Sequence, residues 1–324
     1  MSAASPGSRI LSLAHHQPAR VVTNDDLAAL VDTSDEWIRS RIGIATRRIA
    51  AADESVADMS AAAAAKAVAR AGVDASDIDL VIVATCTAVD RMPSVAARVA
   101  RRLDIPAAAV FDVNAACAGF CYALATAGLA VGGGTSRTAL VVGADKMSDF
   151  LDWQDRSTSV IFGDGAGAAV VAADSGAGPD GIGPVVWGSD PQRGHAISLE
   201  TTGPAGPPAL FRQDGGTVYR WAITSLAPLA RQACERAGVA LAELGAVVTH
   251  QANLRIIESI ARQIGAVNAV VATDVVESGN TSAASVPLAL SKLVERGEVP
   301  SGAPVLLLGF GAGLSYAAQV VRCP

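Results

Sequence analysis

Three short segments, far apart in the chain, contain residues that could carry out acyl transfer. Cys117 is a potential nucleophile, His250 a potential base or donor, and Asn280 a potential amide donor. Long stretches of chain separate all three, so only the fold could bring them together. A thiol that attacks an acyl group forms a thioester. We therefore expect an enzyme that works through an acyl-cysteine intermediate.

Each of these residues also has an ordinary structural explanation. Cys117 opens an apolar helix, where the positive end of the helix dipole favours the thiolate, but a small buried cysteine would leave the same signal in the sequence. His250 follows an apolar strand, at the end of which α/β proteins build their sites, yet a single histidine is more often structural. Asn280 could be a turn residue or a helix cap.

A glycine-rich segment at 309–313, Gly-Phe-Gly-Ala-Gly, lies between two predicted strands. Glycines allow the backbone to approach a bound group closely, and backbone N–H groups in such a turn could hold a developing oxyanion. A plain hairpin is the alternative. The segment is not a dinucleotide-binding fingerprint, because no helix follows it.

The composition indicates a protein with a large core and no nucleic-acid or membrane partner. Of 324 residues, 51% are apolar and 17% charged, and the formal charge of −6 argues against non-specific nucleic-acid binding. No apolar run reaches membrane-spanning length, and residues 1–9 lack an apolar signal core. A reduced, cytosolic protein without a metal site is expected, because the spacing of the five cysteines resembles no zinc ligand set: Cys86, Cys117, Cys121, Cys234 and Cys323.

The chain contains an internal repeat. Three pairs of segments match in the same order: Arg-Ala-Gly-Val at 70–73 and 236–239, Phe-Gly-x-Gly at 162–165 and 310–313, and Asp112 with Asp274. The numbering offset is 166 for the first pair (236 − 70) and 148 for the second (310 − 162). A shared order with similar offsets favours duplication of one α/β unit over coincidence.

Helical and strand-like segments alternate in both halves. We expect helices at 55–71, 94–103, 117–132, 218–237, 254–264 and 283–296, and strands at 79–85, 109–114, 137–144, 245–250, 269–274 and 303–309. The alternation predicts an α/β protein in which helices cover mixed sheets. The helix at 117–132 has almost no polar face, so it should be buried.

The domain organisation follows from the repeat. Residues 1–173 form a first half that carries the nucleophile, and residues 218–324 a second half that carries His250 and Asn280. Residues 174–217 are rich in Gly and Pro without clear periodicity, which predicts a long loop or cap between the halves.

The motifs around the candidate residues resemble those of β-ketoacyl-[acyl-carrier-protein] synthase III. They are Ala-Ala-Cys-Ala-Gly-Phe at 115–120, His-Gln-Ala-Asn at 250–253, Gly-Asn-Thr-Ser-Ala-Ala-Ser at 279–285, the glycine-rich segment at 309–313, Thr-Ser-Asp-Glu-Trp-Ile at 33–38 and Phe-Gly-Asp-Gly-Ala-Gly-Ala at 162–168. The resemblance covers nearly the whole chain. It implies the thiolase fold, with two similar halves in a five-layer αβαβα sandwich, and a homodimer.

The resemblance also implies roles for the candidate residues. Cys117 would accept an acyl group from acyl-CoA, after which malonyl-acyl carrier protein would bind. His250 and Asn280 would hydrogen-bond the malonyl thioester oxygen while decarboxylation forms an enolate. The carbanion would attack the acyl-cysteine, with the backbone N–H groups of Cys117 and Ala312 as the oxyanion hole. The product would be 3-oxoacyl-acyl carrier protein, and the CoA thioester is a substrate, so no cofactor is expected.

The same resemblance assigns CoA and acyl-pocket residues. Trp37 and Arg156 would sandwich the CoA adenine, and Met92 of one subunit would line the acyl pocket of the other. Arg255 and Arg262, two turns apart on one predicted helix, are assigned with Arg220 to a local basic patch for the acidic carrier protein. The full assignments are Thr33, Trp37, Arg41, Arg156 and Asn253 for CoA, Met92 and Phe310 for the acyl pocket, and Gln251, Arg255, Arg262 and Arg220 for the carrier protein. From the residues alone, the CoA contacts could equally be surface or capping residues, and the arginines an ordinary solvated helix face.

Three departures from the family pattern leave part of the function open. Ile42 stands where threonine is common, Thr249 stands where proline is usual, and the segment 190–210 is short. Because that segment covers the acyl pocket in the family, the acyl-chain preference is open, and the flexible Met92 is compatible with short or branched chains. A starter-unit synthase or acyltransferase of a secondary-metabolite pathway is the nearest alternative. A non-catalytic acyl-binding protein is a further one, against which the intact Cys-His-Asn set argues.

Overall fold

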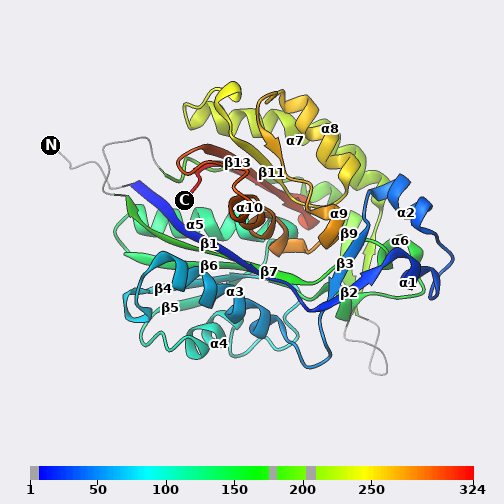
Figure 1. Ribbon diagram of the computed structural model, residues 1–324, viewed down its shortest axis with the longest axis horizontal. Helices are drawn as coiled ribbons and strands as arrows, with labels where there is room; N and C mark the ends of the chain where they lie inside the picture. Colours follow the sequence, from blue (N-terminus) through cyan, green and yellow to red (C-terminus); the bar gives the residue numbers. More distant parts are fainter. Residues whose placement is uncertain (1–6, 175–180, 202–208) are drawn as a thin grey trace.

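The computed structural model describes residues 7–174, 181–201 and 209–324. Two five-stranded sheets form the framework (Figure 1). The first has the order β1 (Gly7–His16), β7 (Gly165–Asp174), β6 (Thr138–Asp145), β4 (Leu80–Ala84), β5 (Ala109–Val113). The second has the order β8 (Val186–Ser189), β14 (Ser315–Arg322), β13 (Pro304–Gly311), β11 (Ala246–Thr249), β12 (Val270–Val271).

Helices cover both outer faces of the sheets and fill the space between them. The first sheet is covered on its outer face by α3 (Val56–Ala71) and α4 (Val95–Arg102), and the second by α7 (Gly215–Arg236) and α8 (Leu254–Ile264). Between the sheets lie α5 (Gly119–Gly132) and α10 (Ser285–Glu295). This is the expected five-layer αβαβα sandwich (Figure 1).

The middle layer is packed largely with small apolar side chains. Helix α5 carries no charged residue, and Ala123, Leu124 and Ala127 on it are fully buried between the sheets. A helix that is apolar on every side can lie only in such a place. None of the helices in the described ranges is long and apolar enough to cross a membrane.

The register of the sheets shows that the two halves repeat the same topology. In each sheet three neighbouring strands pair in parallel, and the other two are added by antiparallel pairing. Leu80 pairs with Ala139 in the first sheet and Ala246 with Val305 in the second, so these paired strands share one numbering offset of 166 (246 − 80 and 305 − 139). Duplication therefore extends to the pairing of individual residues.

Two of the three matched pairs are out of register. Asp145 pairs with Gly165, and Gly311 with Ser315, so the offset between β7 and β14 is 150 (315 − 165) rather than 148. The offset falls from 166 to 150 because the connection between β6 and β7 is much longer than the turn between β13 and β14. Similarly, the pairing of β4 with β5 and of β11 with β12 gives an offset of 161 (270 − 109). The counterpart of Asp112 is therefore Thr273, not Asp274.

The segment at 174–217 is not simply a loop or cap. It contributes β8, which pairs with β14 at the edge of the second sheet, and the hairpin of β9 (Ile197–Glu200) and β10 (Leu210–Gln213). Each of these strands has four residues, too short to show a periodic pattern in the sequence. The parts of the predicted cap at 175–180 and 202–208 lie outside the described residues.

One side of the molecule is built from elements inserted around the first sheet. These are the ribbon of β2 (Arg20–Thr23) and β3 (Thr46–Ile49), helices α1 (Asn24–Ala28) and α2 (Asp35–Ile42), and α6 (Arg156–Ser159). They lie together at the right of Figure 1, close to the hairpin of β9 and the start of α8. Another short helix, α9 (Val275–Ser278), follows β12 in the second half.

Candidate active site

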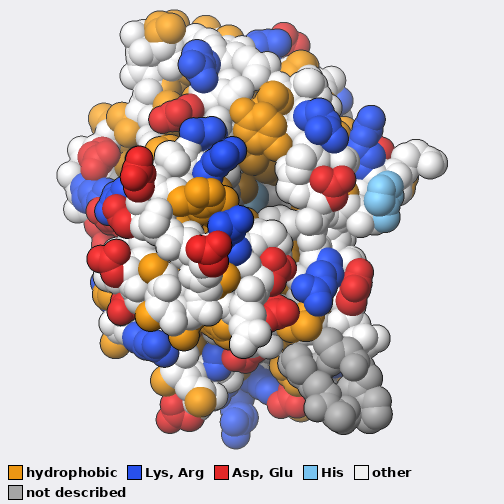
Figure 2. Space-filling view, turned by 90° about the vertical axis from the view of Figure 1, so that its right-hand side faces the viewer, with side chains coloured by type: hydrophobic (Ala, Val, Ile, Leu, Met, Phe, Trp, Pro, Cys, Tyr) orange, Lys and Arg blue, Asp and Glu red, His pale blue; other side chains and the backbone are white. Residues whose placement is uncertain are grey.

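A cavity of about 440 Å³ lies where the two halves meet, and Cys117, His250 and Asn280 all line it. The structure therefore brings the three candidates to one place. Figure 2 shows a hollow in this face of the molecule, with Lys and Arg side chains grouped around it. Much of the remaining lining is apolar and comes from several elements: Met147, Ile161, Phe162, Ile197, Leu199, Phe211, Val218, Ile256 and Phe310.

Cys117 lies in a single turn of 3-10 helix (Ala116–Ala118) between β5 and α5. The turn rests on the end of β13, a strand of the other half. A Cβ atom at Gly311 would lie 2.8 Å from Cys117 Cβ and 3.1 Å from Cys117 Sγ. Such contacts are shorter than packed atoms allow, so the nucleophile can take its position only above a glycine.

The Cys117 thiol is not activated in the way the sequence suggested. Burial raises the pKa of the thiol to about 12, and the carboxylate of Asp145 adds to the increase, although the Ser282 hydroxyl, 3.5 Å from Sγ, opposes it. Desolvation of the charged form is the largest cause of the raised pKa. The raised pKa favours a protonated thiol at neutral pH, in contrast to the thiolate that the position at a helix start favoured.

His250 follows β11 and is almost fully buried. Its backbone N–H donates to the carbonyl of Leu308 at 2.7 Å, its Nδ1 lies 2.7 Å from Ser285 Oγ, and its ring meets Phe310 edge to face at 5.1 Å. Burial lowers the pKa of the imidazole to about 3. The ring is therefore neutral at physiological pH, with one N–H to donate.

Asn280 has a fixed amide orientation. Its Oδ1 accepts a hydrogen bond from the backbone N–H of Ser282 at 2.9 Å, so the amide NH₂ is the group left to donate. The backbone of Asn280 is bonded in both directions, from its N–H to Ile161 O at 2.9 Å and from Gly163 N–H to its carbonyl at 3.1 Å. Asn280 is thus a turn residue, as one alternative held, and closing the turn through Oδ1 leaves its NH₂ group to donate.

The same turn occurs at the equivalent position of the first half. Asn114 Oδ1 accepts from Ala116 N–H at 3.2 Å, as Asn280 Oδ1 accepts from Ser282 N–H. Ala116 has φ of 45° and Ser282 has φ of 51°, a left-handed conformation that is rare for residues other than glycine. With the offset of 166, Asn114 is the counterpart of Asn280, and Ala283 is the counterpart of Cys117.

Asp145 is a buried residue beside the site that sequence analysis missed. Its carboxylate is fully buried and accepts hydrogen bonds of 2.8 to 3.2 Å from the segment that follows β4: from Thr85 Oγ1, the Cys86 N–H, and the N–H and hydroxyl of Thr87. Its second oxygen accepts from the Ala283 N–H of the other half at 3.0 Å. A carboxylate at the end of an otherwise apolar strand was the available signal. Cys86 and Ser282 also line the cavity.

Of the residues assigned to CoA, Asn253 lines the cavity, and Ile42 and Ser157, the chain neighbours of Arg41 and Arg156, line it as well. The Arg156 guanidinium stacks on the Trp37 ring, 4.8 Å from its centroid, and donates to Asp32 O at 2.8 Å. Thr33 Oγ1 is buried and has no hydrogen-bond partner among the described residues. Asn253 lines the cavity, and its Oδ1 also caps α8 by accepting from the N–H of the second helical residue at 2.9 Å. Arg41 is exposed on α2 and does not line the cavity.

The two residues assigned to the acyl pocket lie in different environments. Phe310 is buried and lines the cavity. Met92 is 90% exposed and lies outside the lining of this cavity, so within one chain it has no contact with the site. The structure instead places an aromatic pair in the cavity wall, Phe162 and Phe211, edge to face at 4.6 Å. Phe211 comes from the β9–β10 hairpin, for which the sequence showed no pattern.

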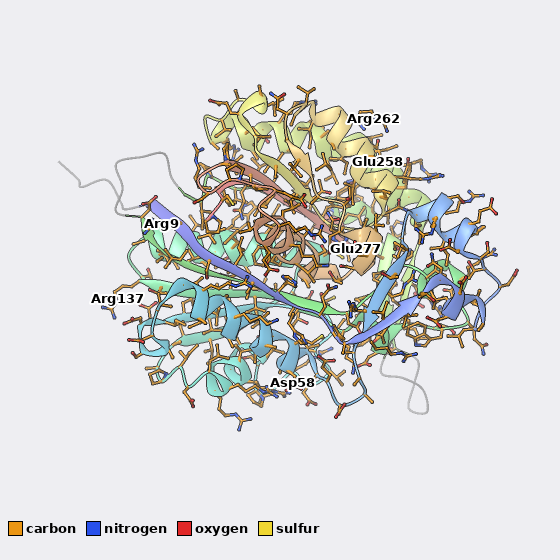
Figure 3. The ribbon with its side chains drawn as sticks, in the orientation of Figure 1. Arg9, Asp58, Arg137, Glu258, Arg262 and Glu277 are labelled. Atoms are coloured by element: carbon orange, nitrogen blue, oxygen red, sulfur yellow. The ribbon has the colours of Figure 1, made fainter. Side chains whose placement is uncertain are left out.

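The residues assigned to carrier-protein contact divide into two groups. Arg220, Arg255 and Arg262 are exposed and form no ion pair with a described residue. Arg255 precedes the cavity residue Ile256, and Figure 3 shows Arg262 on the same helix, α8, near Glu258.

Gln251 belongs elsewhere, and its assignment to the carrier protein is wrong. Its side chain is fully buried: Nε2 donates to Thr249 O at 2.8 Å and Ala272 O at 3.2 Å, and Oε1 accepts from Val275 N–H at 3.0 Å. These hydrogen bonds connect the end of β11, which precedes His250, to the start of α9. Its amide has no free group for a partner protein.

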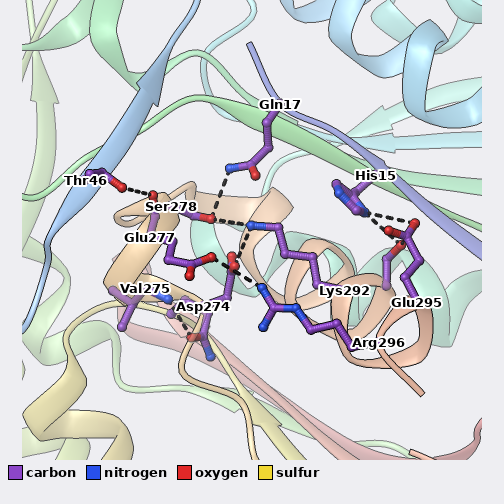
Figure 4. A network of polar contacts seen from close by, with 12 residues as sticks. His15, Gln17, Thr46, Asp274, Val275, Glu277, Ser278, Lys292, Glu295 and Arg296 are labelled. Atoms are coloured by element: carbon purple, nitrogen blue, oxygen red, sulfur yellow. Dashed lines mark hydrogen bonds and ion pairs between the residues drawn. The ribbon is translucent and has the colours of Figure 1, made fainter. Parts of the chain in front are cut away.

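A buried polar network supports α9, the helix that leads to Asn280. Lys292 Nζ donates to Asp274 Oδ1 at 2.6 Å and to Ser278 Oγ at 2.9 Å, and Gln17 Nε2 donates to the same hydroxyl at 3.0 Å (Figure 4). Asp274 and Ser278 mark the two ends of α9. The network therefore fixes the segment from which the Asn280 turn departs.

Comparison with known proteins finds relatives that match nearly the whole chain. Two family descriptions match the chain: 3-oxoacyl-[acyl-carrier-protein (ACP)] synthase III at residues 111–191, and the C-terminal part of the same family at residues 234–323. The chain is 63% identical over 318 residues to β-ketoacyl-[acyl-carrier-protein] synthase III 4 of Streptomyces coelicolor, covering 98% of this chain and 99% of that protein. It is 64% identical over 319 residues to synthase III 2 of Streptomyces avermitilis, with the same coverage.

A solved structure shows the same fold. The priming β-ketosynthase of the R1128 polyketide biosynthetic pathway superposes with a TM-score of 0.95 at 43% identity, covering 100% of this chain and 98% of that one. The fold is thus the thiolase-like sandwich, and the protein is an acyltransferase-type condensing enzyme. The chain belongs to the β-ketoacyl-[acyl-carrier-protein] synthase III family.

Proposed function

We propose that this enzyme condenses a short acyl-CoA with malonyl-acyl carrier protein, releasing CoA and CO₂ and forming 3-oxoacyl-acyl carrier protein. The observation that carries the proposal is the convergence of the Cys117 thiol, the His250 imidazole and the Asn280 amide on one largely apolar cavity. A nucleophile and two oriented donors are what a thioester exchange followed by decarboxylation requires.

The first step forms the acyl-enzyme. Cys117 Sγ attacks the acyl-CoA carbonyl, the thiol proton passes to the departing CoA sulfur, and a Cys117 thioester remains. Because the thiol is protonated at rest, with a pKa of about 12, its proton must leave as the C–S bond forms. The backbone N–H groups of Cys117 and Ala312 stabilise the tetrahedral oxyanion, which explains why the turn of one half rests on the strand end of the other.

The second step uses the donors. His250 and Asn280 hydrogen-bond the thioester oxygen of the malonyl group, the C–CO₂ bond breaks, and the electron pair forms an enolate stabilised by these donors. The enolate carbon attacks the acyl-cysteine carbonyl and expels the Cys117 sulfur as thiolate, which takes up a proton from water. These steps balance without any redox change or cofactor. The neutral state of His250 suits a donor that must not carry a permanent charge in an apolar cavity.

The substrates are proposed to enter past α2, α6 and α8. The Trp37–Arg156 stack is the proposed adenine site, with Thr33, Arg41 and Asn253 as further CoA contacts. The exposed Arg220, Arg255 and Arg262 form the proposed docking surface for an acidic carrier protein.

A homodimer is proposed to complete the pocket. Strand β5 is the edge of the first sheet, and Phe111 on it is 39% exposed. Met92, 90% exposed, and Val89, 58% exposed, follow the neighbouring strand β4. Pairing of two β5 edges would cover these apolar side chains, and it would bring Met92 to the acyl pocket of the second copy.

The experiment that tests the function separates the two steps. Incubation with acetyl-CoA should add one acetyl mass to the protein on Cys117, and subsequent malonyl-acyl carrier protein should release a 3-oxoacyl product. Cys117→Ala should give no adduct, whereas Cys121→Ala, which alters a buried cysteine outside the cavity lining, should keep it. An adduct that persists in Cys117→Ala, or transfer of the acyl group without release of CO₂, would overturn the proposal.

A role in starting a polyketide chain is a second candidate, favoured by the similarity to the R1128 priming β-ketosynthase. The chemistry would be the same, but the carrier protein and the acyl chain would differ. Competition among acetyl-, propionyl-, isobutyryl- and longer acyl-CoAs distinguishes the two. A preference for the shortest chain supports fatty-acid initiation, and a preference for a longer or branched starter supports the polyketide role.

A further inference from the structure

Ser285 contacts the His250 imidazole at its Nδ1 atom. It opens α10, is fully buried, and places Oγ 2.7 Å from His250 Nδ1. The ring and the hydroxyl thus form a short hydrogen bond without access to water. Which of the two atoms carries the hydrogen decides what the other ring nitrogen can do, because a neutral imidazole has one donor and one acceptor.

A second contact settles the direction of this hydrogen bond. The backbone N–H of Gln251 points to Ser285 Oγ at 3.4 Å. An N–H group can only donate, so the hydroxyl oxygen accepts there. The oxygen could accept a second hydrogen bond from Nδ1, but the hydrogen of this buried hydroxyl would then have no acceptor among the described residues, so it points toward His250 Nδ1. Nδ1 is then the acceptor, and Nε2 carries the ring hydrogen. Because His250 lines the cavity, Nε2–H is the donor that its ring can offer there.

The first half of the molecule shows that the fold itself does not need a hydroxyl here. With the offset of 166, the counterpart of His250 is Ala84 and the counterpart of Ser285 is Gly119. These two residues are also in contact, since a Cβ on Gly119 would lie 3.0 Å from Ala84 Cβ. One copy of the unit therefore closes this position with the smallest residues, whereas the other holds a histidine and a serine.

We propose that Ser285 is a positioning residue, which holds His250 in the tautomer with hydrogen on Nε2 so that the ring donates to the substrate oxygen during decarboxylation. This proposal rests on the function proposed above and adds a residue to it. Loss of the hydroxyl would release the ring to exchange between its two tautomers. In the tautomer with hydrogen on Nδ1, Nε2 presents a lone pair to an oxygen that is becoming negative, which opposes the reaction.

The chain provides a matched control on the same helix. Ser291, also buried on α10, places Oγ 3.0 Å from the Nδ1 of His15, a histidine that does not line the cavity. Ser291→Ala therefore removes a serine–histidine hydrogen bond of the same kind from the same helix. Ser285→Thr retains the hydroxyl and is the conservative variant.

The test combines ¹⁵N NMR of the imidazoles with the two half-reactions. Ser285→Ala should shift His250 from the pure Nε2–H pattern toward averaged nitrogen shifts. Decarboxylation of malonyl-acyl carrier protein should fall about tenfold, the effect of one hydrogen bond worth about 1.4 kcal/mol, while acylation of Cys117 changes less than about threefold. Ser285→Thr should restore both readouts, and Ser291→Ala should match wild type.

Two outcomes would overturn the proposal. Persistence of the Nε2–H pattern in Ser285→Ala would show that another group sets the tautomer. An equal loss in both half-reactions would indicate a general structural role. Failure of wild-type protein to decarboxylate the malonyl substrate would instead overturn the proposed function, and the NMR measurement would still decide the role of Ser285.

Discussion

Strand β6 of the first half and strand β13 of the second end at equivalent residues, Asp145 and Gly311, and each end supports the turn of the opposite half. Gly311 has no side chain, and Cys117 occupies the space above it. Asp145 fills the same space with a carboxylate, which accepts from the Ala283 N–H at 3.0 Å. The two turns share a left-handed residue and the same asparagine hydrogen bond, but Cys117 faces the cavity whereas its counterpart Ala283 is buried outside the lining.

The neighbouring positions differ in the same sense. His250 and Ser285 in the second half correspond to Ala84 and Gly119 in the first, where small residues pack directly against each other. The comparison teaches that duplication supplied the turn geometry twice, including the left-handed residues Ala116 and Ser282. Side chains at only a few paired positions decide which copy holds a nucleophile.

Moving the thiol to the other turn is the severest test of this comparison. The double variant Cys117→Ala/Ala283→Cys should form no acyl adduct with acetyl-CoA, because position 283 is fully buried and lies outside the cavity lining. Intact-protein mass spectrometry measures the adduct, and wild type treated in parallel is the positive control. Acylation of the thiol introduced at 283 would show that the two turns are functionally alike.

The paired asparagines provide the next test. Asn280→Ala should slow decarboxylation by about 10²–10³-fold, the usual cost of removing one donor from an oxyanion site. Asn114→Ala removes the same side chain from the equivalent turn and should change the rate less than about threefold. Release of labelled CO₂ from malonyl-acyl carrier protein measures both. Equal losses would mean that the first turn also contributes a donor to this step.

The protonation of the nucleophile can be measured directly. Because the Cys117 pKa is raised to about 12, the thiolate fraction should increase about tenfold per pH unit between pH 7 and 9. The rate at which iodoacetamide alkylates Cys117, followed by peptide mapping, should rise in proportion. A plateau below pH 9 would show that the open turn activates its thiol after all.

The smallest effect concerns stability. The His250 pKa is lowered to about 3 in the folded protein, from 6.5 when unfolded. The stability that depends on the neutral buried ring is therefore fully present above pH 6.5 and is lost as the pH falls toward 3. The free energy of unfolding should lose about 1.4 kcal/mol per pH unit through this residue between pH 6 and 4. His250→Ala, which installs the residue of the first half, should show a shallower pH dependence in urea denaturation. Parallel curves for the two proteins would contradict the buried neutral ring.

Sequence patterns predicted the elements with strong periodicity and clear caps. Helix α8 begins and ends at the predicted residues, between the Asn253 cap and the left-handed Gly265. Strand β12 is shorter than predicted, two residues instead of six, because the chain turns into α9 there. Strands β8, β9 and β10 were missed because four residues carry too little pattern.

The candidate site was predicted less completely than the fold. Cys117, His250 and Asn280 were found because each residue type suggests its chemistry. Asp145 and Ser285 act through three-dimensional contacts with residues 138 and 35 positions away, which no local pattern records. Gln251 was misplaced because its position in a motif does not show that its side chain is buried. The raised Cys117 pKa depends on burial by the opposite half, which spacing cannot show.

The close approach of Gly311 to Cys117 also has a consequence for the newborn chain. The ribosome makes Cys117 well before Gly311, by an interval of about 10–40 s at roughly 5–20 residues per second. During that time β13 has not yet been made and cannot cover the thiol. Its pKa is then that of an exposed cysteine, about 8.5. The nucleophile is thus most open to oxidants while the protein is being synthesised, and completion of the last sheet gives it its protection.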